Sequence, residues 1–214
     1  MYLGALIKMV LYKLVLGELA TNCYIFVNEL TKKAVAFDIG DEPSKVLAFE
    51  QEKGIQITDI VLTHGHFDHI GGVYLFANRG TKVHMCIDEK DFVTDNTLNL
   101  SAYFQMGLKP FNVDNYFTDN DDLILNDITF KVIQTPGHTV GSCSFIVEDY
   151  IVCGDTLFDG SYGRVDFPTG DFDTLVQSAN KLFALEKDYT LLSGHGIETS
   201  LYKERETNPI NYWK

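Results

Sequence analysis

Short apolar stretches rich in β-branched and aromatic residues recur along the chain, and residues that favour turns separate them. Such stretches are typical of β-strands that are half or fully buried. We predict strands over residues 10–16, 23–27, 34–38, 57–63, 82–85, 128–134, 143–147, 150–153 and 189–192.

Helical periodicity is clearest at residues 171–185, where apolar side chains recur on one face and Asp171 or Asp173 can cap the first turn. Residues 88–120 mix helical pieces with glycine, proline and asparagine, and we expect a partly helical insertion over the rim of a site. Further helices are predicted over residues 43–53, 70–77 and 202–207. Strands in two groups with helices between them indicate a layered α/β domain, and we treat residues 1–214 as a single domain.

The chain carries a formal net charge of -13, with acidic residues spread along its length. A chain this acidic repels phosphate backbones, so we expect a small-molecule substrate and no nucleic acid as partner. The apolar runs are too short to span a membrane, and residues 10–17 are interpreted as a strand rather than as part of a signal peptide. The four cysteines form no C-x-x-C pair, which favours buried, reduced thiols and a cytoplasmic protein.

The strongest chemical signal is the segment T-H-G-H-F-D-H at residues 63–69, which follows a predicted strand. His64 and His66 are two residues apart, so they point to the same side on extended backbone. Asp68 and His69 follow at the turn into a helix. Four such ligands in six residues suit two metal ions better than one, and imidazole with carboxylate suits zinc, iron or manganese.

The remaining histidines extend this pattern. His138 and His195 lie in glycine-containing turns after predicted strands, and Asp155 lies in the turn G-D-T after another. Ligands grouped at one edge of a sheet would be arranged in this way. His84 lies within a predicted strand and is interpreted as a structural or surface residue.

These motifs carry a family resemblance. H-x-H-x-D-H, T-P-G-H-T-x-G-S, G-D-T-L-F and a late G-H-G occur in this order in the metallo-β-lactamase superfamily, which the chain resembles from about residue 17 to residue 208. The longer phrases at residues 154–171 and 194–209 are similar to small bacterial proteins of the glyoxalase II (hydroxyacylglutathione hydrolase) branch.

The resemblance implies a four-layer αββα sandwich with two divalent metal ions at one edge of the sheets, zinc first and iron or manganese as alternatives. It implies one ion on His64, His66 and His138, a second on Asp68, His69 and His195, and Asp155 as the bridge between them. A carboxylate rather than a cysteine at position 155 points away from true β-lactamases.

On this resemblance we expect a hydrolase in which a metal-bridging hydroxide attacks a thioester of the hydroxyacyl-thiol type or a related ester. Asp68 is expected to serve as a ligand and to orient the hydroxide. The second hypothesis is a mononuclear iron persulfide dioxygenase, which needs fewer ligands, so the presence of His195 beside Asp68 and His69 favours the two-metal hydrolase. A lactonase is a further alternative, because the same hydroxide attacks lactones.

Two further residues concern the substrate. Arg164 matches a basic position of the larger enzymes and could clamp a substrate carboxylate or form an ion pair with Asp166. Tyr162 is predicted to line the pocket. Only 19 residues follow His195, so we expect no C-terminal helical domain that grips glutathione.

Overall fold

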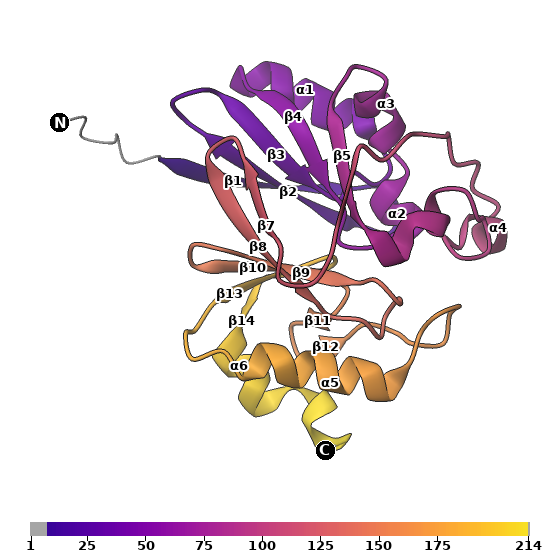
Figure 1. Ribbon diagram of the computed structural model, residues 1–214, viewed down its shortest axis with the longest axis vertical. Coiled ribbons are helices and arrows are strands. Elements are labelled where there is room, and N and C mark those ends of the chain that lie inside the picture. Colours follow the sequence, from indigo (N-terminus) through magenta and orange to yellow (C-terminus); the bar gives the residue numbers. More distant parts are fainter. Residues whose placement is uncertain (1–7, 214) are drawn as a thin grey trace.

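The computed structural model describes residues 8–213. Two six-stranded sheets lie face to face, and helices cover their outer faces, which gives the expected αββα order of layers (Figure 1). The first sheet has the order β1 (Met9–Leu16), β2 (Thr21–Asn28), β3 (Lys33–Phe37), β4 (Gln56–Val61), β5 (Lys82–Cys86) and β6 (Asn115–Phe117). The second sheet has the order β14 (Thr199–Ser200), β13 (Thr190–Ser193), β10 (Tyr150–Gly154), β9 (Cys143–Val147), β8 (Ile128–Gln134) and β7 (Asp122–Leu125).

Helical segments cross between the parallel strands of the first sheet. β1, β2 and β3 pair antiparallel, whereas β3, β4, β5 and β6 pair parallel. Parallel neighbours need a crossover connection, usually a helix. The connections to β4 and β5 contain α1 (Pro43–Lys53), α2 (Phe67–Ile70) and α3 (Val73–Ala77). The carboxyl ends of the parallel strands therefore meet at one edge of the sheet.

The second sheet carries its helices on the opposite outer face (Figure 1). They are α5 (Phe172–Phe183) and α6 (Leu201–Thr207), with the short helix η2 (Pro209–Trp213) after them. α5 begins at Asp171, whose carboxylate accepts a hydrogen bond from the backbone of Thr174 at 2.8 Å, as its N-cap position predicts. A small hairpin of β11 (Leu157–Phe158) and β12 (Ser161–Tyr162) follows β10.

Three apolar layers hold these four layers together. The first lies between α1, α3 and the first sheet, the second between the two sheets, and the third beneath α5 and α6. The middle layer is aromatic: the ring of Phe130 lies 5.4 Å from that of Phe26 and 5.3 Å from that of Phe37. Because such rings bury large apolar areas, this layer fixes the two sheets against each other.

Most predicted strands and helices are confirmed within one or two residues, but the helix predicted over residues 70–77 is wrong as a single element. It is split into α2 and α3 at Gly71 and Gly72. A Cβ atom at Gly72 would lie 2.3 Å from the carbonyl oxygen of Gly40, so the backbones approach more closely there than any other residue permits.

Short or exposed elements escaped the sequence pattern. Residues 88–120 contain the short helices η1 (Ile87–Val93) and α4 (Ser101–Phe104), and also β6, which was not predicted. β7, β11, β12, β14 and η2 were missed as well. Between residues 8 and 213, no helix combines the length and apolar character that crossing a membrane requires.

The aromatic layer generates a stability prediction. Phe130→Ala leaves a cavity between the sheets and should lower the free energy of unfolding by about 3–5 kcal/mol in urea denaturation of the metal-loaded protein. Ile124→Ala on the neighbouring strand β7 is the control, because Ile124 is 70% exposed and its loss should cost less than about 0.5 kcal/mol. Equal losses in the two variants would contradict a core between the sheets.

Candidate metal centre

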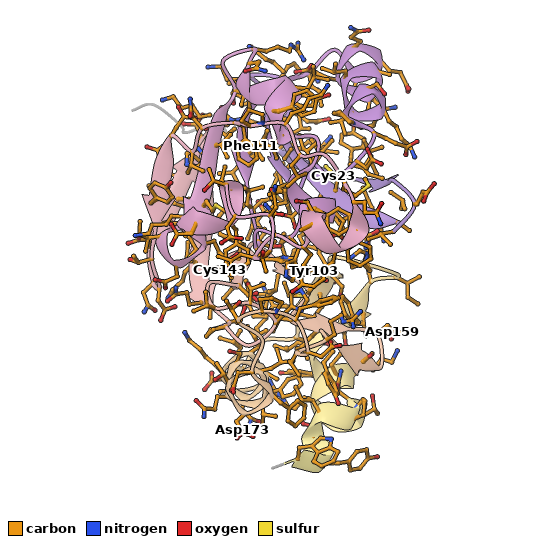
Figure 2. All side chains as sticks on the ribbon, turned by 90° about the vertical axis from the view of Figure 1, so that its right-hand side faces the viewer. Cys23, Tyr103, Phe111, Cys143, Asp159 and Asp173 are labelled. Atoms are coloured by element: carbon orange, nitrogen blue, oxygen red, sulfur yellow. The ribbon has the colours of Figure 1, made fainter. Side chains whose placement is uncertain are left out.

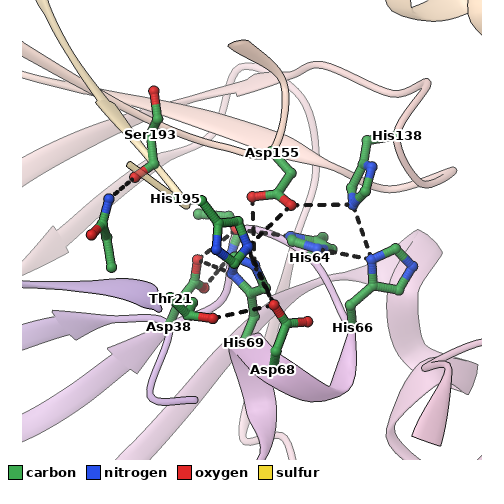
Figure 3. A network of polar contacts seen from close by, with 12 residues as sticks. Thr21, Asp38, His64, His66, Asp68, His69, His138, Asp155, Ser193 and His195 are labelled. Carbon is green, nitrogen blue, oxygen red and sulfur yellow. Dashed lines mark hydrogen bonds and ion pairs between the residues drawn. The ribbon is translucent and has the colours of Figure 1, made fainter. Parts of the chain in front are cut away.

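The predicted site residues lie where strands of both sheets end at one edge of the molecule. In the first sheet, residues 62–69 follow the end of β4 and lead into α2. In the second sheet, β8, β10 and β13 run in the same direction, and His138, Asp155 and His195 follow their carboxyl ends. The fold thus brings residues far apart in the sequence to one place (Figure 3).

All seven predicted ligands come together there. Within residues 8–213 they form three overlapping groups whose ligand atoms lie within 4.8 Å of one another. The first group is His64 with His66 and His138, and the second group is Asp68 with His69 and His195. A further set, His64 with His69 and Asp155, shares a residue with each of them and connects the two. That these residues bind metal stays a prediction. The hydrogen bonds around them show which ring nitrogen atoms carry a proton and which present a lone pair.

In the first group, two nitrogen atoms that can only accept face the same nitrogen atom of His66. Nδ1 of His138 lies 2.7 Å from the carbonyl oxygen of Arg164, which only accepts, so Nδ1 carries the proton and Nε2 is left with a lone pair. Nδ1 of His64 contacts the hydroxyl of Thr63, which itself donates to Asp38, so His64 also presents an unprotonated Nε2.

These two nitrogen atoms lie 2.9 Å (His138) and 3.1 Å (His64) from Nδ1 of His66, which has at most one hydrogen to share between them. The three histidines are almost completely buried.

In the second group, Nδ1 of His69 donates to Asp38 at 2.9 Å and Nδ1 of His195 donates to the carbonyl oxygen of Leu19 at 3.0 Å. The two Nε2 atoms lie 3.4 Å apart, and Oδ2 of Asp68 lies 3.6 Å and 3.2 Å from them. The side chain of His195 is 27% exposed, so this group opens to solvent whereas the first is enclosed.

Asp155 lies between the two groups. Its Oδ1 is 3.5 Å from Nε2 of His69, and its Oδ2 is 3.6 Å from Nε2 of His138 and 3.5 Å from that of His195. Oδ1 is buried and has no hydrogen-bond partner among the described residues. An unpaired buried carboxylate oxygen is costly, and a cation beside it removes that cost.

The donor set fits divalent metal ions. Imidazole nitrogen and carboxylate oxygen are the ligands of zinc and of iron, and each of the two outer groups supplies three of them to one point. Crowded lone pairs in the first group repel one another unless a cation lies between them. The backbone carbonyls and carboxylate that hold the Nδ1 atoms also fix the tautomer and the ring orientation that a metal needs.

The pKa shifts follow the same arrangement. Burial, reinforced by the neighbouring imidazoles, holds the pKa of His64 well below its ordinary value, so the residue is a neutral ligand. Burial also opposes a charge on His69, but the carboxylates of Asp68, Asp155 and Asp38 outweigh it and raise the pKa of His69 to about 10. The negative charge of these carboxylates favours a metal ion at His69 as it favours a proton, so the metal ion and the proton compete for Nε2.

Sequence reasoning missed Asp38, which directly follows β3. Its Oδ2 accepts from Nδ1 of His69 and from the hydroxyl of Thr63, and its Oδ1 accepts from the backbone of Thr63 at 2.8 Å. Asp38 therefore orients one ligand directly and fixes the first residue of the 63–69 segment. The available signal was an acidic residue, Asp38, at the end of the apolar strand predicted over residues 34–38.

Glu89 in η1 was also missed. It is fully buried, and its two carboxyl oxygens accept from the backbone of Gly65 at 2.9 Å and of Gly141 at 2.8 Å. Burial raises the pKa of Glu89 to about 7, while these backbone donors oppose the rise. One side chain thus joins the loop of His64 and His66 to the loop that follows His138.

The turn between β1 and β2 reaches the second group. Besides the carbonyl group of Leu19 on His195, the hydroxyl of Thr21 donates to Asp68 at 3.2 Å. The backbone of Asn22 donates to the carbonyl group of Gly194 at 2.7 Å. The first sheet therefore holds a ligand loop of the second sheet directly.

The remaining predicted residues have less direct positions. The Arg164 side chain is exposed, forms two hydrogen bonds to Asp166 at 2.7 and 2.6 Å, and lies over the ring of Phe167. Tyr162 packs against Phe172 and the apolar layer under α5, which favours a structural role. Both substrate-binding assignments stay predictions.

His84, interpreted as structural or as a surface residue, is buried and lies 2.9 Å from the carboxylate of Asp59. It takes no part in the three groups of ligand atoms. The four cysteines are free and buried, as expected.

Comparison with known proteins finds relatives named as hydrolases and a similar structure named as a metallo-β-lactamase. A probable metallo-hydrolase of Bacillus subtilis, YqgX, is 33% identical over 91% of this chain and 93% of its own. Hydroxyacylglutathione hydrolase GloC of Haemophilus influenzae is 30% identical over 88% of this chain and 92% of its own. The crystal structure of BLEG-1, described as a B3 metallo-β-lactamase, superposes with a TM-score of 0.89 at 32% identity and covers 94% of this chain and 98% of its own.

The family model of the metallo-β-lactamase superfamily matches residues 16–195, a range that includes both ligand groups and Asp155. Together with two sheets in αββα order and a cluster of histidine and aspartate at their edge, this match identifies the chain as a member of the metallo-β-lactamase superfamily.

Proposed function

We propose that the protein is a binuclear metallohydrolase that cleaves a thioester of the hydroxyacyl-thiol type or a related ester. The observation that carries the proposal is the pair of three-ligand groups with the unpaired carboxylate of Asp155 between them. A set of this size exceeds what one tetrahedral ion uses. The similarity to hydroxyacylglutathione hydrolase GloC supports the thioester as substrate.

Each group has a separate task in this proposal. His64, His66 and His138 would hold one ion, Asp68, His69 and His195 would hold the other, and Asp155 would bridge them. Zinc is the ion we expect first, with iron or manganese as alternatives. Two bound cations would lower the pKa of a water molecule to near neutrality and polarise the substrate carbonyl group.

The residues of the chain then set the direction of attack. Asp68 is 14% exposed and is held by the hydroxyl of Thr21, so its carboxylate can orient the attacking water and accept its proton. The more exposed second group is the side from which a substrate can approach. A thiolate is a good leaving group that needs little general-acid help, which suits a thioester.

The first test removes a ligand. His64→Ala takes a nitrogen atom out of the enclosed first group, so the purified protein should lose bound metal and thioester turnover while its circular dichroism spectrum is retained. Metal content is measured by plasma mass spectrometry. His84→Gln is the matched control, because His84 is equally buried but pairs with Asp59, and this variant should keep its metal. Full metal and full turnover in His64→Ala would show that the assignment is wrong.

The second test leaves every ligand in place. Asp38→Asn weakens the hydrogen bond that orients His69, so metal affinity should fall about 10- to 100-fold. Competition with a coloured chelator measures the affinity. Asp59→Asn is the control, since Asp59 holds His84 in the same way but lies outside the ligand groups. Unchanged affinity in Asp38→Asn would mean that His69 needs no such support or binds no metal.

The third test separates the hydrolase from its alternatives. The zinc-loaded protein should hydrolyse thioesters, with S-lactoylglutathione as the first substrate, and should consume no oxygen with glutathione persulfide. A lactone and a β-lactam complete the panel and should be cleaved more slowly. Oxygen uptake by the iron-loaded protein without thioester hydrolysis would favour the persulfide dioxygenase instead.

A further inference from the structure

A cavity of about 350 Å³ opens beside the second ligand group. Its walls come from the β1–β2 turn with the strand residues beside it, from the segment between β3 and α1, from α2 with Gly71, and from the end of α4 with the segment that follows it. The lining is mostly apolar and comprises Leu16, Gly17, Glu18, Leu19, Thr21, Asp41, Phe67, Asp68, Gly71, Phe104, Met106, Gly107 and Leu108. This volume lies at the lower end of the range for small-molecule sites, which is about 300–1,000 Å³.

The cavity is directly connected to the predicted chemistry. Asp68 belongs to its wall and to the second ligand group. Leu19 lines the cavity, and its carbonyl oxygen accepts the hydrogen bond of His195. Thr21, another lining residue, donates to Asp68. A substrate whose reacting carbon lies at the ligand groups therefore has this cavity within reach of its neighbouring atoms.

Large apolar side chains are exposed around the cavity. Leu19 is 47% exposed, Phe104 45% and Met106 42%, and the ring of Phe104 lies 4.9 Å from that of Phe67. In Figure 2, which views the molecule from this side, Tyr103 of α4 lies at the height where the two halves of the sandwich meet. Exposed apolar residues that gather at a concave site mark a surface that binds a ligand.

The charge of the cavity selects against anionic ligands, as its apolar surface selects for apolar ones. None of the described residues that line it is a lysine or an arginine, whereas Glu18 and Asp41 are acidic. Asp68 also lines it, but a metal ion bound to Asp68 would neutralise that charge. Two nearby lysines are engaged elsewhere: Lys45 donates to the carbonyl group of Val15, and Lys109 lies over the ring of Tyr74. An anionic group placed in this cavity would lose its hydration and meet like charge.

The geometry points to an uncharged, apolar acyl chain as the occupant of this cavity. This inference rests on the proposed thioesterase or esterase function and defines its substrate class. Thiol carriers such as glutathione are polar and anionic, so the apolar, acid-rimmed cavity fits the acyl arm of the substrate and not the carrier. Among the thioesters and esters proposed above, the protein therefore prefers those whose acyl group carries several methylene carbons, and it should cleave the short lactoyl thioester less efficiently than these.

Binding of uncleavable analogues tests the inference without turnover. S-butyl, S-hexyl and S-octyl N-acetylcysteamine, which are thioethers, are titrated calorimetrically into the zinc-loaded protein. Each buried methylene should lower Kd about threefold to fourfold, and hence about tenfold from butyl to hexyl. The hexyl compound with a terminal carboxylate should bind at least about tenfold more weakly than its uncharged parent, because it meets Glu18 and Asp41.

Two variants test whether the dependence of Kd on chain length arises in the cavity. Leu19→Asp places a charge in the cavity wall and should abolish the dependence of Kd on chain length. Leu30→Asp is the matched control, because Leu30 is also an exposed leucine in a strand-connecting turn, between β2 and β3, and does not line the cavity. It should leave the dependence unchanged. A Kd independent of chain length in the wild type, the same slope in Leu19→Asp, or tighter binding of the carboxylate would overturn the inference.

The proposed function fails in a different way. A protein that binds the alkyl series with the expected slope but hydrolyses no thioester or ester keeps its apolar cavity and contradicts the hydrolase. A protein that cleaves thioesters but shows no dependence of Kd on chain length is a hydrolase whose acyl chain lies elsewhere.

Discussion

Buried imidazole nitrogens that face one another across less than 3.5 Å are the constraint on which this structure depends. Five histidines and two aspartates occupy the edge between the sheets. In four of the histidines Nδ1 is already bound to a backbone carbonyl, to a hydroxyl or to Asp38, namely in His64, His69, His138 and His195. Each of these four rings is thereby turned so that its Nε2 points inward. Lone pairs and carboxylates concentrated in this way are stable only with a cation among them, so the polar network that orients the rings also specifies what they bind.

The two halves of the sandwich supply complementary parts of that cluster. Residues 64–69 come from the first sheet, whereas His138, Asp155 and His195 come from the second. The aromatic layer around Phe130 sets the distance between the sheets. Short polar contacts at their shared edge fix the ligand loops relative to one another. Glu89 connects two ligand loops, and the β1–β2 turn holds both Asp68 and His195. Apolar packing supplies most of the stability of the fold, whereas these few buried polar contacts fix the positions of the ligand side chains.

The sequence predicted the parts of the structure that depend on local pattern. The strands of the second sheet around Phe130 and Phe145 are short apolar runs with clear turn signals, and α5 has a cap and one apolar face. The ligand motifs were visible because residues 64–69 contain four potential ligands within six positions, and His138 and His195 repeat the pattern of a histidine in a glycine-containing turn. β7 was missed because its apolar run, residues 123–125, is only three residues long and is flanked by Asp122 and Asn126.

Other features depend on contacts between distant residues and have no local signal. The break at Gly71 and Gly72 is caused by the backbone of Gly40, and the role of Glu89 appears only when Gly65 and Gly141 are brought together. The cavity beside Asp68 is likewise formed by segments that are separate in the sequence, namely the β1–β2 turn, the segment between β3 and α1, α2, and the end of α4 with the residues after it.

Anomalous diffraction from crystals of the zinc-loaded protein, recorded on both sides of the zinc absorption edge, tests the central claim most directly. The account predicts two peaks at the edge of the sheets, one among His64, His66 and His138 and one among Asp68, His69 and His195, with the Asp155 carboxylate between them. A single peak, or peaks away from these side chains, would contradict it.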